Sequence, residues 1–323
     1  MAKIVSIAYR PFRNSDPPAL AEIWRSQPPE RGLMQPMSAN LFEQMVLSKP
    51  YFENQGLIVA LDGRQPVGFV HAAFGPSDDG QRLACQLGVT CLVMVRLDYQ
   101  RKGIGAELLA RSEGFLRGRG AQVLYAGAIQ PLNGFYLGLY GGSELPGVLD
   151  SAPRAQYLFK SQCYREIDRV CVLQRELAGF RAPVDRGQMQ IRRRTIVRTN
   201  DEPPVHTWWE ACTWGGLERT RFELSARDGD GPLATATFWT IEPLAHSWGV
   251  RAAGLIELEV LPAHRRQGLA TFLLSEALRH LQSQGASLIE VQTMKHNAAA
   301  LQLYQKLGFK QIDEGAVYRK DER

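Results

Sequence analysis

Two short basic stretches that contain glycine could bind an anion. The first is Gln100-Arg101-Lys102-Gly103-Ile104-Gly105-Ala106, and the second is Arg265-Arg266-Gln267-Gly268-Leu269-Ala270-Thr271. Each lies between an apolar, strand-like run and an amphipathic, helix-like run. A glycine turn that opens a helix presents unpaired N–H groups at the positive end of the helix dipole. Both stretches therefore predict a site for an anion such as a pyrophosphate.

The spacing of the two stretches indicates an internal repeat. The offset that relates Gly103 to Gly268 also relates Val95 to Val260. A chain of 323 residues fits two domains of roughly 150 residues each. We predict domains at residues 1–178 (the first half) and 189–323 (the second half). Residues 179–188 hold glycine and proline without hydrophobic periodicity, so we predict a linker there.

Composition and charge favour a soluble, globular, cytoplasmic protein. Hydrophobic residues make up 45% and charged residues 22% of the chain. No apolar run reaches the roughly 20 residues that span a bilayer, and the first residues lack an apolar segment of signal-peptide length. The five cysteines lack metal-site spacing, so we expect no metal. The net charge of +5 is mild, and the cluster Arg192-Arg193-Arg194 lacks the interleaved aromatic residues of a nucleic-acid site.

The expected elements follow a similar order in both halves. Strand-like runs flank the turn Asp62-Gly63, which predicts a hairpin. Further strands are expected at residues 90–95, 122–125, 191–197, 222–224, 234–241, 255–260 and 288–291. A helix follows each glycine turn. The region from Trp208 to Trp214 stands where the first half has two short helices, and its tryptophans could line an acceptor site or cover the edge of the sheet.

A longer pattern in the second half is more specific than the turn alone. The run Leu258-x-Val260-x-Pro262-x-x-Arg265-Arg266-Gln267-Gly268-Leu269-Ala270 is followed by a helix from Asn297 to Tyr304 and then by Gly308-Phe309. This order closely resembles the acetyl-CoA-binding core of the GNAT superfamily of acyl-CoA N-acyltransferases. Because both halves carry the turn, the chain resembles a tandem GNAT protein with the duplicated layout of the mycothiol synthases.

The resemblance implies an α/β (α+β) fold of two tandem GNAT domains. Each would be a mixed, mostly antiparallel sheet flanked by helices, in which the fourth and fifth strands splay apart. Main-chain N–H groups of the turns would hold the pyrophosphate of acetyl-CoA, and the strand that ends at Val260 would pair with its pantetheine arm. The implied coenzyme-binding residues are Leu258, Glu259, Val260, Arg265, Arg266, Gln267, Gly268, Leu269, Ala270, Thr271 and Asn297, together with Val95, Arg101, Lys102, Gly103, Ile104, Gly105 and Ala106.

The resemblance also implies catalytic roles in the second half. The N–H near Val260 would polarise the thioester carbonyl, and the Tyr304 hydroxyl would protonate the departing thiolate. Glu257 and Glu259 share one face of their strand, so either could be the general base. Each residue has a structural alternative: Asn297 as a helix cap, Tyr304 as a packed aromatic residue, and the glutamates as surface residues.

The first half matches the GNAT pattern less completely. Arg96-Leu97-Asp98 replaces the proline-containing approach to the turn, and Phe159 occupies the place of the tyrosine. Residues 129–150 are rich in glycine and are predicted to be an insertion before the last helix. We therefore expect the first half to bind coenzyme A but not to catalyse.

The function predicted on these grounds is acetyl-CoA-dependent N-acetylation of a primary amine on a small molecule or peptide. The alternative is a non-catalytic, coenzyme A-binding regulatory module. A Rossmann domain is disfavoured because neither turn has the third glycine of Gly-x-Gly-x-x-Gly. The sequence leaves the acceptor and the acyl chain length open. A monomer is compatible with it, since two paired domains can supply what single-domain relatives gain by dimerising.

Overall fold

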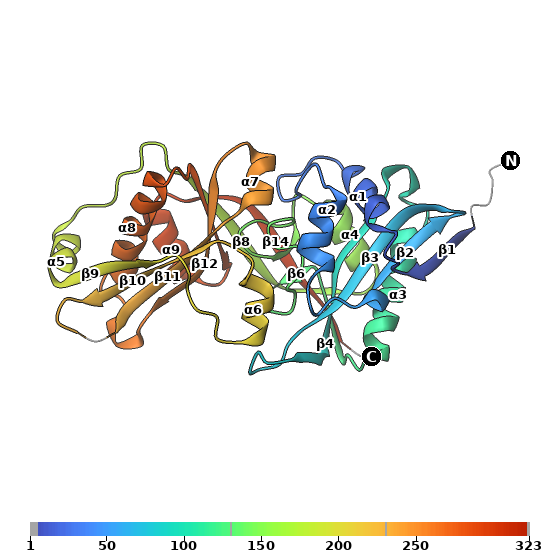
Figure 1. The fold of residues 1–323 in the computed structure, drawn as a ribbon, viewed down its shortest axis with the longest axis horizontal. Helices are drawn as coiled ribbons and strands as arrows, with labels where there is room; N and C mark the ends of the chain where they lie inside the picture. Colours follow the sequence, from blue (N-terminus) through green and yellow to red (C-terminus); the bar gives the residue numbers. More distant parts are fainter. Residues whose placement is uncertain (1–5, 130, 230, 322–323) are drawn as a thin grey trace.

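The computed structural model describes residues 6–129, 131–229 and 231–321, and the strands among them form one sheet that runs through both halves (Figure 1). The predicted domain ends, 1–5 and 322–323, lie outside the described residues. The strands are β1 (Ile7–Pro11), β2 (Leu57–Asp62), β3 (Gln65–Pro76), β4 (Leu83–Val95), β5 (Val123–Ala126), β6 (Ala128–Ile129), β7 (Pro146–Leu149), β8 (Arg165–Glu176), β9 (Thr195–Asn200), β10 (Arg219–Ala226), β11 (Pro232–Thr240), β12 (Ala252–Val260), β13 (Leu288–Met294) and β14 (Lys310–Asp321).

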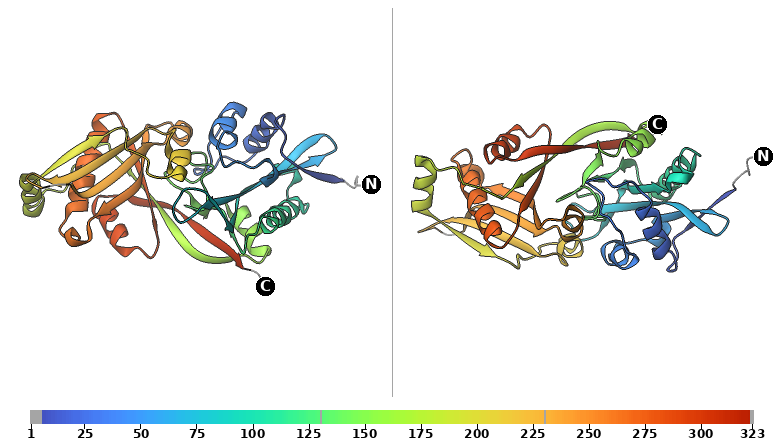
Figure 2. Two further views of the ribbon diagram at one scale, coloured as in Figure 1. Left: turned by 60° about the horizontal axis from the view of Figure 1, so that its bottom comes forward. Right: turned by 90° about the horizontal axis from the view of Figure 1, so that it is seen from above.

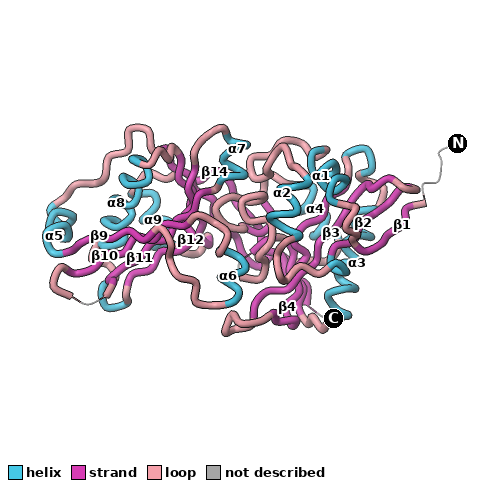
Figure 3. The backbone as a smooth tube through the Cα atoms, in the orientation of Figure 1, coloured by secondary structure: helices cyan, strands magenta, loops and turns pink. Residues whose placement is uncertain are grey.

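Helices flank this sheet on both faces (Figure 3). Helix α8 illustrates why they form, because its buried residues include Leu273, Leu274, Ala277 and Leu278, which repeat at helical spacing. The helices are α1 (Pro17–Arg25), α2 (Ala39–Phe42), α3 (Ile104–Gly118), α4 (Pro153–Ser161), α5 (Arg186–Arg194), α6 (Trp208–Trp214), α7 (Glu242–Trp248), α8 (Leu269–Ser283) and α9 (Ala298–Lys306).

The predicted splay of two neighbouring strands is present in both halves. Strand β4 pairs in parallel with β5 as far as Thr90, and β12 pairs in parallel with β13 as far as Leu255, the equivalent residue of the repeat. The register with the preceding strand then shifts at the next residue, Cys91 in β4 and Ile256 in β12. A bulge bends its strand, so each half opens into a fork at the same point of the repeat.

The final strands of the two halves are exchanged. Strand β8, the last of the first half, pairs with β13 of the second half, and β14, the last of the second half, pairs with β5 of the first half. The two strands also pair with each other, which gives the order β1-β2-β3-β4-β5-β14-β8-β13-β12-β11-β10-β9. In Figure 2, right, the red strand β14 runs from the second half to the side of the first. Each half therefore lacks a complete sheet without the other.

Two expectations about local structure have clear outcomes. The predicted strand at 191–197 is wrong in its first part, because Arg186–Arg194 form helix α5 and β9 starts only at Thr195. The Asp185 side chain caps α5 by accepting from the N–H of Gln188 at 2.8 Å. By contrast, the described residues between β6 and β7 contain no helix, which agrees with an insertion.

The halves also meet through aromatic residues. Trp209 of α6 packs on Tyr51 of the first half, with ring centroids 4.6 Å apart, and Trp208 contacts the same ring. Trp214 packs edge-on against Trp239 of β11. Trp208 and Trp209 are therefore packing residues of the contact between the halves, whereas Trp214 packs within the second half; the sequence predicted that they line an acceptor site or cover the edge of the sheet.

Candidate acyl-CoA sites in the two halves

The two glycine turns have the same backbone conformation. Arg101 and Arg266 have positive φ angles of 61° and 62°, and Gly103 and Gly268 have φ of 82° and 81°. Each turn opens a helix of 15 residues, α3 or α8, and no side chain caps either N-terminus. The N–H groups of the first helical turn are therefore available to an anion, as a pyrophosphate site requires.

The strand ends beside the turns are also equivalent. The carbonyl of Val95 accepts from Gln100 Nε2 at 2.9 Å, and the carbonyl of Val260 accepts from Arg265 Nε at 3.1 Å. Gln100 and Arg265 occupy the same position of the repeat, so each half fixes its turn to its splayed strand with one side chain. The constant offset between the halves would have revealed Gln100 from the sequence, but it was not predicted as a site residue.

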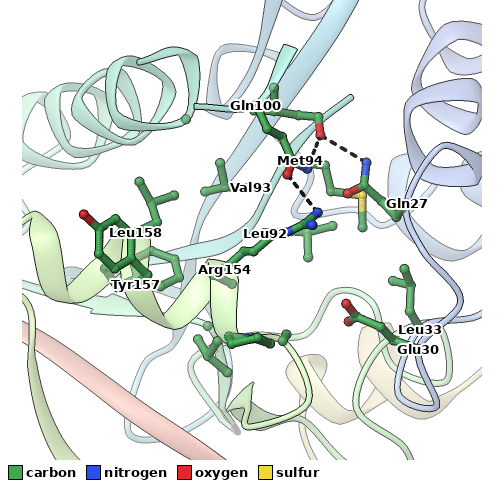
Figure 4. A pocket seen from close by; sticks show the side chains of 18 of the residues that line it. Gln27, Glu30, Leu33, Leu92, Val93, Met94, Gln100, Arg154, Tyr157 and Leu158 are labelled. Carbon is green, nitrogen blue, oxygen red and sulfur yellow. Dashed lines mark hydrogen bonds between the residues drawn. The ribbon is translucent and has the colours of Figure 1, made fainter. Parts of the chain in front are cut away.

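A cavity of about 850 Å³ occupies the fork of the first half (Figure 4). This volume lies within the range of ligand-binding pockets. One wall is the splayed strand from Cys91 to Val95, another is the glycine turn, and a third is α4. Apolar groups dominate the lining, which suits a pantetheine arm. They include Leu33, Leu92, Val93, Met94, Leu97, Val148, Leu158 and Phe159.

A few polar side chains lie along the wall of this cavity (Figure 4). Arg154 donates to Gln100 Oε1 at 3.0 Å, and Gln27 donates to the carbonyl of Val95 at 3.2 Å. Burial raises the pKa of Glu30, while the positive charge of Arg154 opposes that shift. Gln27 and Glu30 lie on the loop after α1 and Arg154 lies on α4, where no sequence pattern pointed to them.

The predicted residues of the first half divide into two groups around the cavity. Val95, Arg101, Gly103, Gly105 and Ala106 line it. The side chains of the other two point elsewhere. Lys102 donates to the carbonyl of Asp98 at 2.7 Å, and Ile104 is buried in the core between α3 and the sheet.

In the second half, the predicted residues lie on β12, on the turn after it, at the start of α8 and before α9. The side chains of Leu269 and Thr271 are buried, so these residues can offer only main-chain groups to a ligand. Leu258 and Val260 pack partly against the core that α8 covers. Asn297 is a helix cap, since its side chain accepts from the N–H of Ala300 at 3.2 Å.

The ring of Tyr304 is buried beside Phe309, with centroids 5.7 Å apart. Its hydroxyl has no hydrogen-bond partner within the described residues. Burial raises the pKa of Tyr304, and the negative charge of Glu144 raises it further. The hydroxyl therefore keeps its proton at neutral pH. In the first half the equivalent residue is Phe159, which packs on Tyr164 and Tyr318 and has no proton to donate.

The carboxylates on the splayed strand also distinguish the halves. Glu257 and Glu259 are exposed, and Glu257 accepts from the Thr237 hydroxyl at 3.0 Å. The corresponding residues of β4 are Leu92 and Met94, which line the cavity. Only the second half thus has ionisable groups on this face of its splayed strand.

Helix α5 distinguishes the surroundings of the two turns. Gln188 Nε2 donates to the carbonyl of Gly268 at 3.4 Å, and Ile191 lies close to the same glycine. Arg192 forms an ion pair of 3.7 Å with Glu276 of α8. The space beside Gly103 is open. The turn of the second half is therefore partly covered by the helix that replaces the predicted strand.

The described residues contain neither a helix that could span a membrane nor a cluster of potential metal ligands. No helix in the ranges 6–129, 131–229 and 231–321 is long and apolar enough to cross a membrane. Within the same ranges, no three histidine, cysteine or acidic residues gather as ligands for a metal ion.

Solved structures with a similar fold cover nearly the whole chain. A fungal multi-domain GH3 β-N-acetylglucosaminidase, whose structure is described as containing a GCN5-related glucosamine N-acetyltransferase region, matches 99% of this chain at 17% identity with a TM-score of 0.74. The match spans only 38% of that protein. A tandem GNAT protein from the clavulanic acid biosynthesis pathway matches 98% of both chains at 14% identity with a TM-score of 0.64.

A GCN5-related N-acetyltransferase from Sphaerobacter thermophilus matches 98% of this chain and 95% of its own at 15% identity, with a TM-score of 0.64. No curated protein sequence matches the chain. The family model for the acetyltransferase (GNAT) family matches twice, at residues 18–140 and 189–309. The chain therefore belongs to the GNAT acetyltransferase family, and its layout is that of a tandem GNAT protein.

Proposed function

We propose that this protein transfers the acetyl group of acetyl-CoA to a primary amine, and that the second half carries the chemistry. The observation that supports this assignment most strongly is the difference between Tyr304 and Phe159 at equivalent positions. Both halves have an uncapped helix N-terminus and a fork, which fit a pyrophosphate and a pantetheine arm. At this position of the last helix, only the second half has a hydroxyl that can donate a proton.

The proposed reaction is a direct attack of the amine on the thioester. Main-chain N–H groups from Arg266 to Thr271 would hold the pyrophosphate, with Arg265 and Arg266 adding positive charge. The N–H near Val260 would stabilise the oxyanion that forms during attack. Tyr304 would then protonate the thiolate as the carbon–sulfur bond breaks. We retain Glu257 and Glu259 as predicted bases that act directly or through water.

The acceptor is proposed to be an amine on a small molecule or a peptide. Glucosamine is the first acceptor to assay, because the fungal protein with the highest TM-score given above is described by activity on that amino sugar. The identity of 17% supports the fold and not the substrate. A panel of amino sugars, aminoglycosides and peptide N-termini would therefore accompany it.

Replacement of Tyr304 tests the assignment. Tyr304→Phe removes only the hydroxyl, so we expect kcat to fall by at least about tenfold; a general acid commonly contributes about a hundredfold or more. The affinity for acetyl-CoA should change little. Thiol release measures the rate, and calorimetry measures the affinity. Phe159→Tyr is the matched control and should leave kcat unchanged. An unaltered rate in Tyr304→Phe would remove the acid role.

The cavity of the first half favours a second function for that half. Its turn and apolar walls would bind coenzyme A without chemistry, as in a regulatory module. Suppose that calorimetry shows tight binding of coenzyme A, but that acetyl-CoA releases no thiol with any amine of the panel. The whole chain would then be a non-catalytic, coenzyme A-binding module. Binding together with thiol release would restrict it to the first half.

A further inference from the structure

A segment of the first half packs against the second half beside its fork. The carbonyl of Ser143 accepts from Trp239 Nε1 at 2.9 Å, and the N–H of Ser143 donates to Glu290 Oε1 at 2.7 Å. Gln292 Nε2 donates to the carbonyl of Glu144 at 3.1 Å. All three anchors lie on β11 and β13. The insertion that follows β6 is therefore fixed to the second half where its fork opens.

Close approach of the main chain makes this arrangement possible. Gly142 has a φ of 142°, and a Cβ at this position would collide with the carboxylate of Glu290. Glu290 is fully buried and has charged and polar partners, an ion pair with Arg31 and a hydrogen bond of 2.8 Å from Gln174. The positive charge of Arg31 thus compensates the negative charge of Glu290. Because Gly142 has no side chain, the main chain comes close enough for the N–H of Ser143 to bond to Glu290.

Glu144 differs from Glu290 in lacking such partners. Its side chain is half-buried, and its carboxylate has neither a hydrogen bond nor an ion pair in the described part of the chain. Burial and the charge of Glu290 raise the pKa of Glu144 to about 8. Glu144 in turn raises the pKa of Tyr304, so these two side chains are electrostatic neighbours.

We propose that Glu144 is the general base of the second half, supplied by the first half across the contact between them. This inference rests on the proposed N-acetyltransferase function. The carboxylate accepts a proton from the ammonium group of the acceptor, and the neutral amine then attacks the thioester carbon. As the carbon–sulfur bond breaks, Tyr304 protonates the thiolate and recovers a proton from the nitrogen of the new amide. Glu144 finally releases its proton to water.

The location of Glu144 supports it over the strand glutamates as the base. Glu257 and Glu259 are exposed to water, and Glu257 is hydrogen-bonded to Thr237. The main chain of Glu144 is held by Gln292, the residue of β13 just beyond its last pairing with β12, and the charge of Glu144 raises the pKa of the proposed acid, Tyr304. A base with a raised pKa also binds the proton of an ammonium group more strongly.

The test compares Glu144→Gln and Glu144→Ala with wild type in the full chain, with glucosamine and the amine panel as acceptors. We expect kcat/KM to fall about a hundredfold or more in both variants. Formate should restore activity to Glu144→Ala because it fits the space left by the side chain and can accept the proton. A structural role would not respond to formate.

Stability and a matched control complete the test. Glu144→Gln removes a buried charge, so the Tm at pH 8 should be unchanged or higher. Glu113 is a half-buried carboxylate on α3 that pairs with Lys320, and Glu113→Gln should retain wild-type kcat/KM. Wild-type rates in active Glu144→Gln would overturn this inference and leave the proposed function intact. A wild-type protein that acetylates no amine of the panel would overturn both.

Discussion

The two halves share a main-chain framework but differ in the side chains that face the fork. Turn, helix, bulge and splayed strands coincide at one constant offset along the chain. In the first half the fork holds an apolar cavity, with Leu92 and Met94 on the strand and Phe159 on the helix. In the second half these positions are Glu257, Glu259 and Tyr304. The two halves therefore share a main-chain geometry, and the side chains that differ between them are the ones on which the proposed division of labour rests.

On the face of the sheet opposite α3 and α8, equivalent positions of the two halves also carry different side chains. In the first half, His71 of β3 pairs with Leu92 and lies within the rings of Phe52, Phe135 and Tyr136. In the second half, the equivalent position on β11 is Thr237, which pairs with Glu257. The insertion after β6 contributes to both places. Its Phe135 and Tyr136 fill the first half, and its Ser143 and Glu144 reach the second.

Separating the halves should have the largest effect. Residues 189–323 expressed alone lose β8, whose Cys171 and Leu173 pack in the core of the second half. The edge of β13 would also lose its partner. We expect this fragment to aggregate or to unfold without a cooperative transition, as measured by gel filtration and thermal melting.

Co-expression with residues 1–178 is the control for this separation. It should restore a soluble complex, because each fragment supplies the strand that the other lacks. A fragment 189–323 that is monomeric and melts cooperatively would contradict a requirement for exchange, since β14 would then have folded back onto β13.

Acid should destabilise the first half through His71. Burial lowers the pKa of His71 to about 3, and its Nδ1 lies 2.9 Å from the Tyr136 hydroxyl. A folded-state pKa below that of the unfolded chain gives stability that is complete above about pH 6.5 and is lost as the pH falls toward 3. At about 1.4 kcal/mol per pH unit, the total is roughly 3–5 kcal/mol.

His71→Gln checks this assignment by denaturant unfolding at pH 4 and pH 7. The amide can still bond to Tyr136 but does not titrate, so the difference between the two pH values should shrink. Thr237→Gln, at the equivalent position of the second half, should keep the wild-type pH dependence. The same acid sensitivity in His71→Gln and wild type would assign the effect to other groups.

The smallest effects should come from the two turn glycines. Gly103→Ala and Gly268→Ala each place a Cβ at a φ near 80°, which costs about 1–2 kcal/mol. The stability losses should be similar, because Gly103 faces open space and Gly268 faces the flexible end of Gln188. Their functional effects should differ. Gly268→Ala should slow acetyl transfer, whereas Gly103→Ala should weaken only the coenzyme site of the first half by calorimetry.

Equal losses of acetyl transfer in the two glycine variants would contradict a division of labour between the halves. A loss confined to Gly103→Ala would transfer the catalytic role to the first half. The two variants thus compare the halves with the same chemical change at the same backbone angle.

The sequence predicted the features that depend on local geometry. A turn with glycine at positive φ, an uncapped helix start and the helix from Asn297 to Tyr304 are each encoded within a few residues. The fork itself was predicted through the family resemblance. Helix α5 was missed because Arg192, Arg193 and Arg194 give no apolar periodicity, and its start is set by the cap at Asp185.

By itself, the sequence determined the duplication, the two glycine turns that open helices, and the phenylalanine that stands in the first half where the second half has Tyr304. Only the tertiary structure decided that β8 and β14 exchange partners and that Glu144 of one half lies near enough to Tyr304 of the other for its charge to raise the pKa of that tyrosine. Local patterns record how a residue relates to its chain neighbours. Strand exchange and the location of an insertion depend on long-range pairing, in which the competing arrangements bury similar residues and leave the same pattern in the sequence.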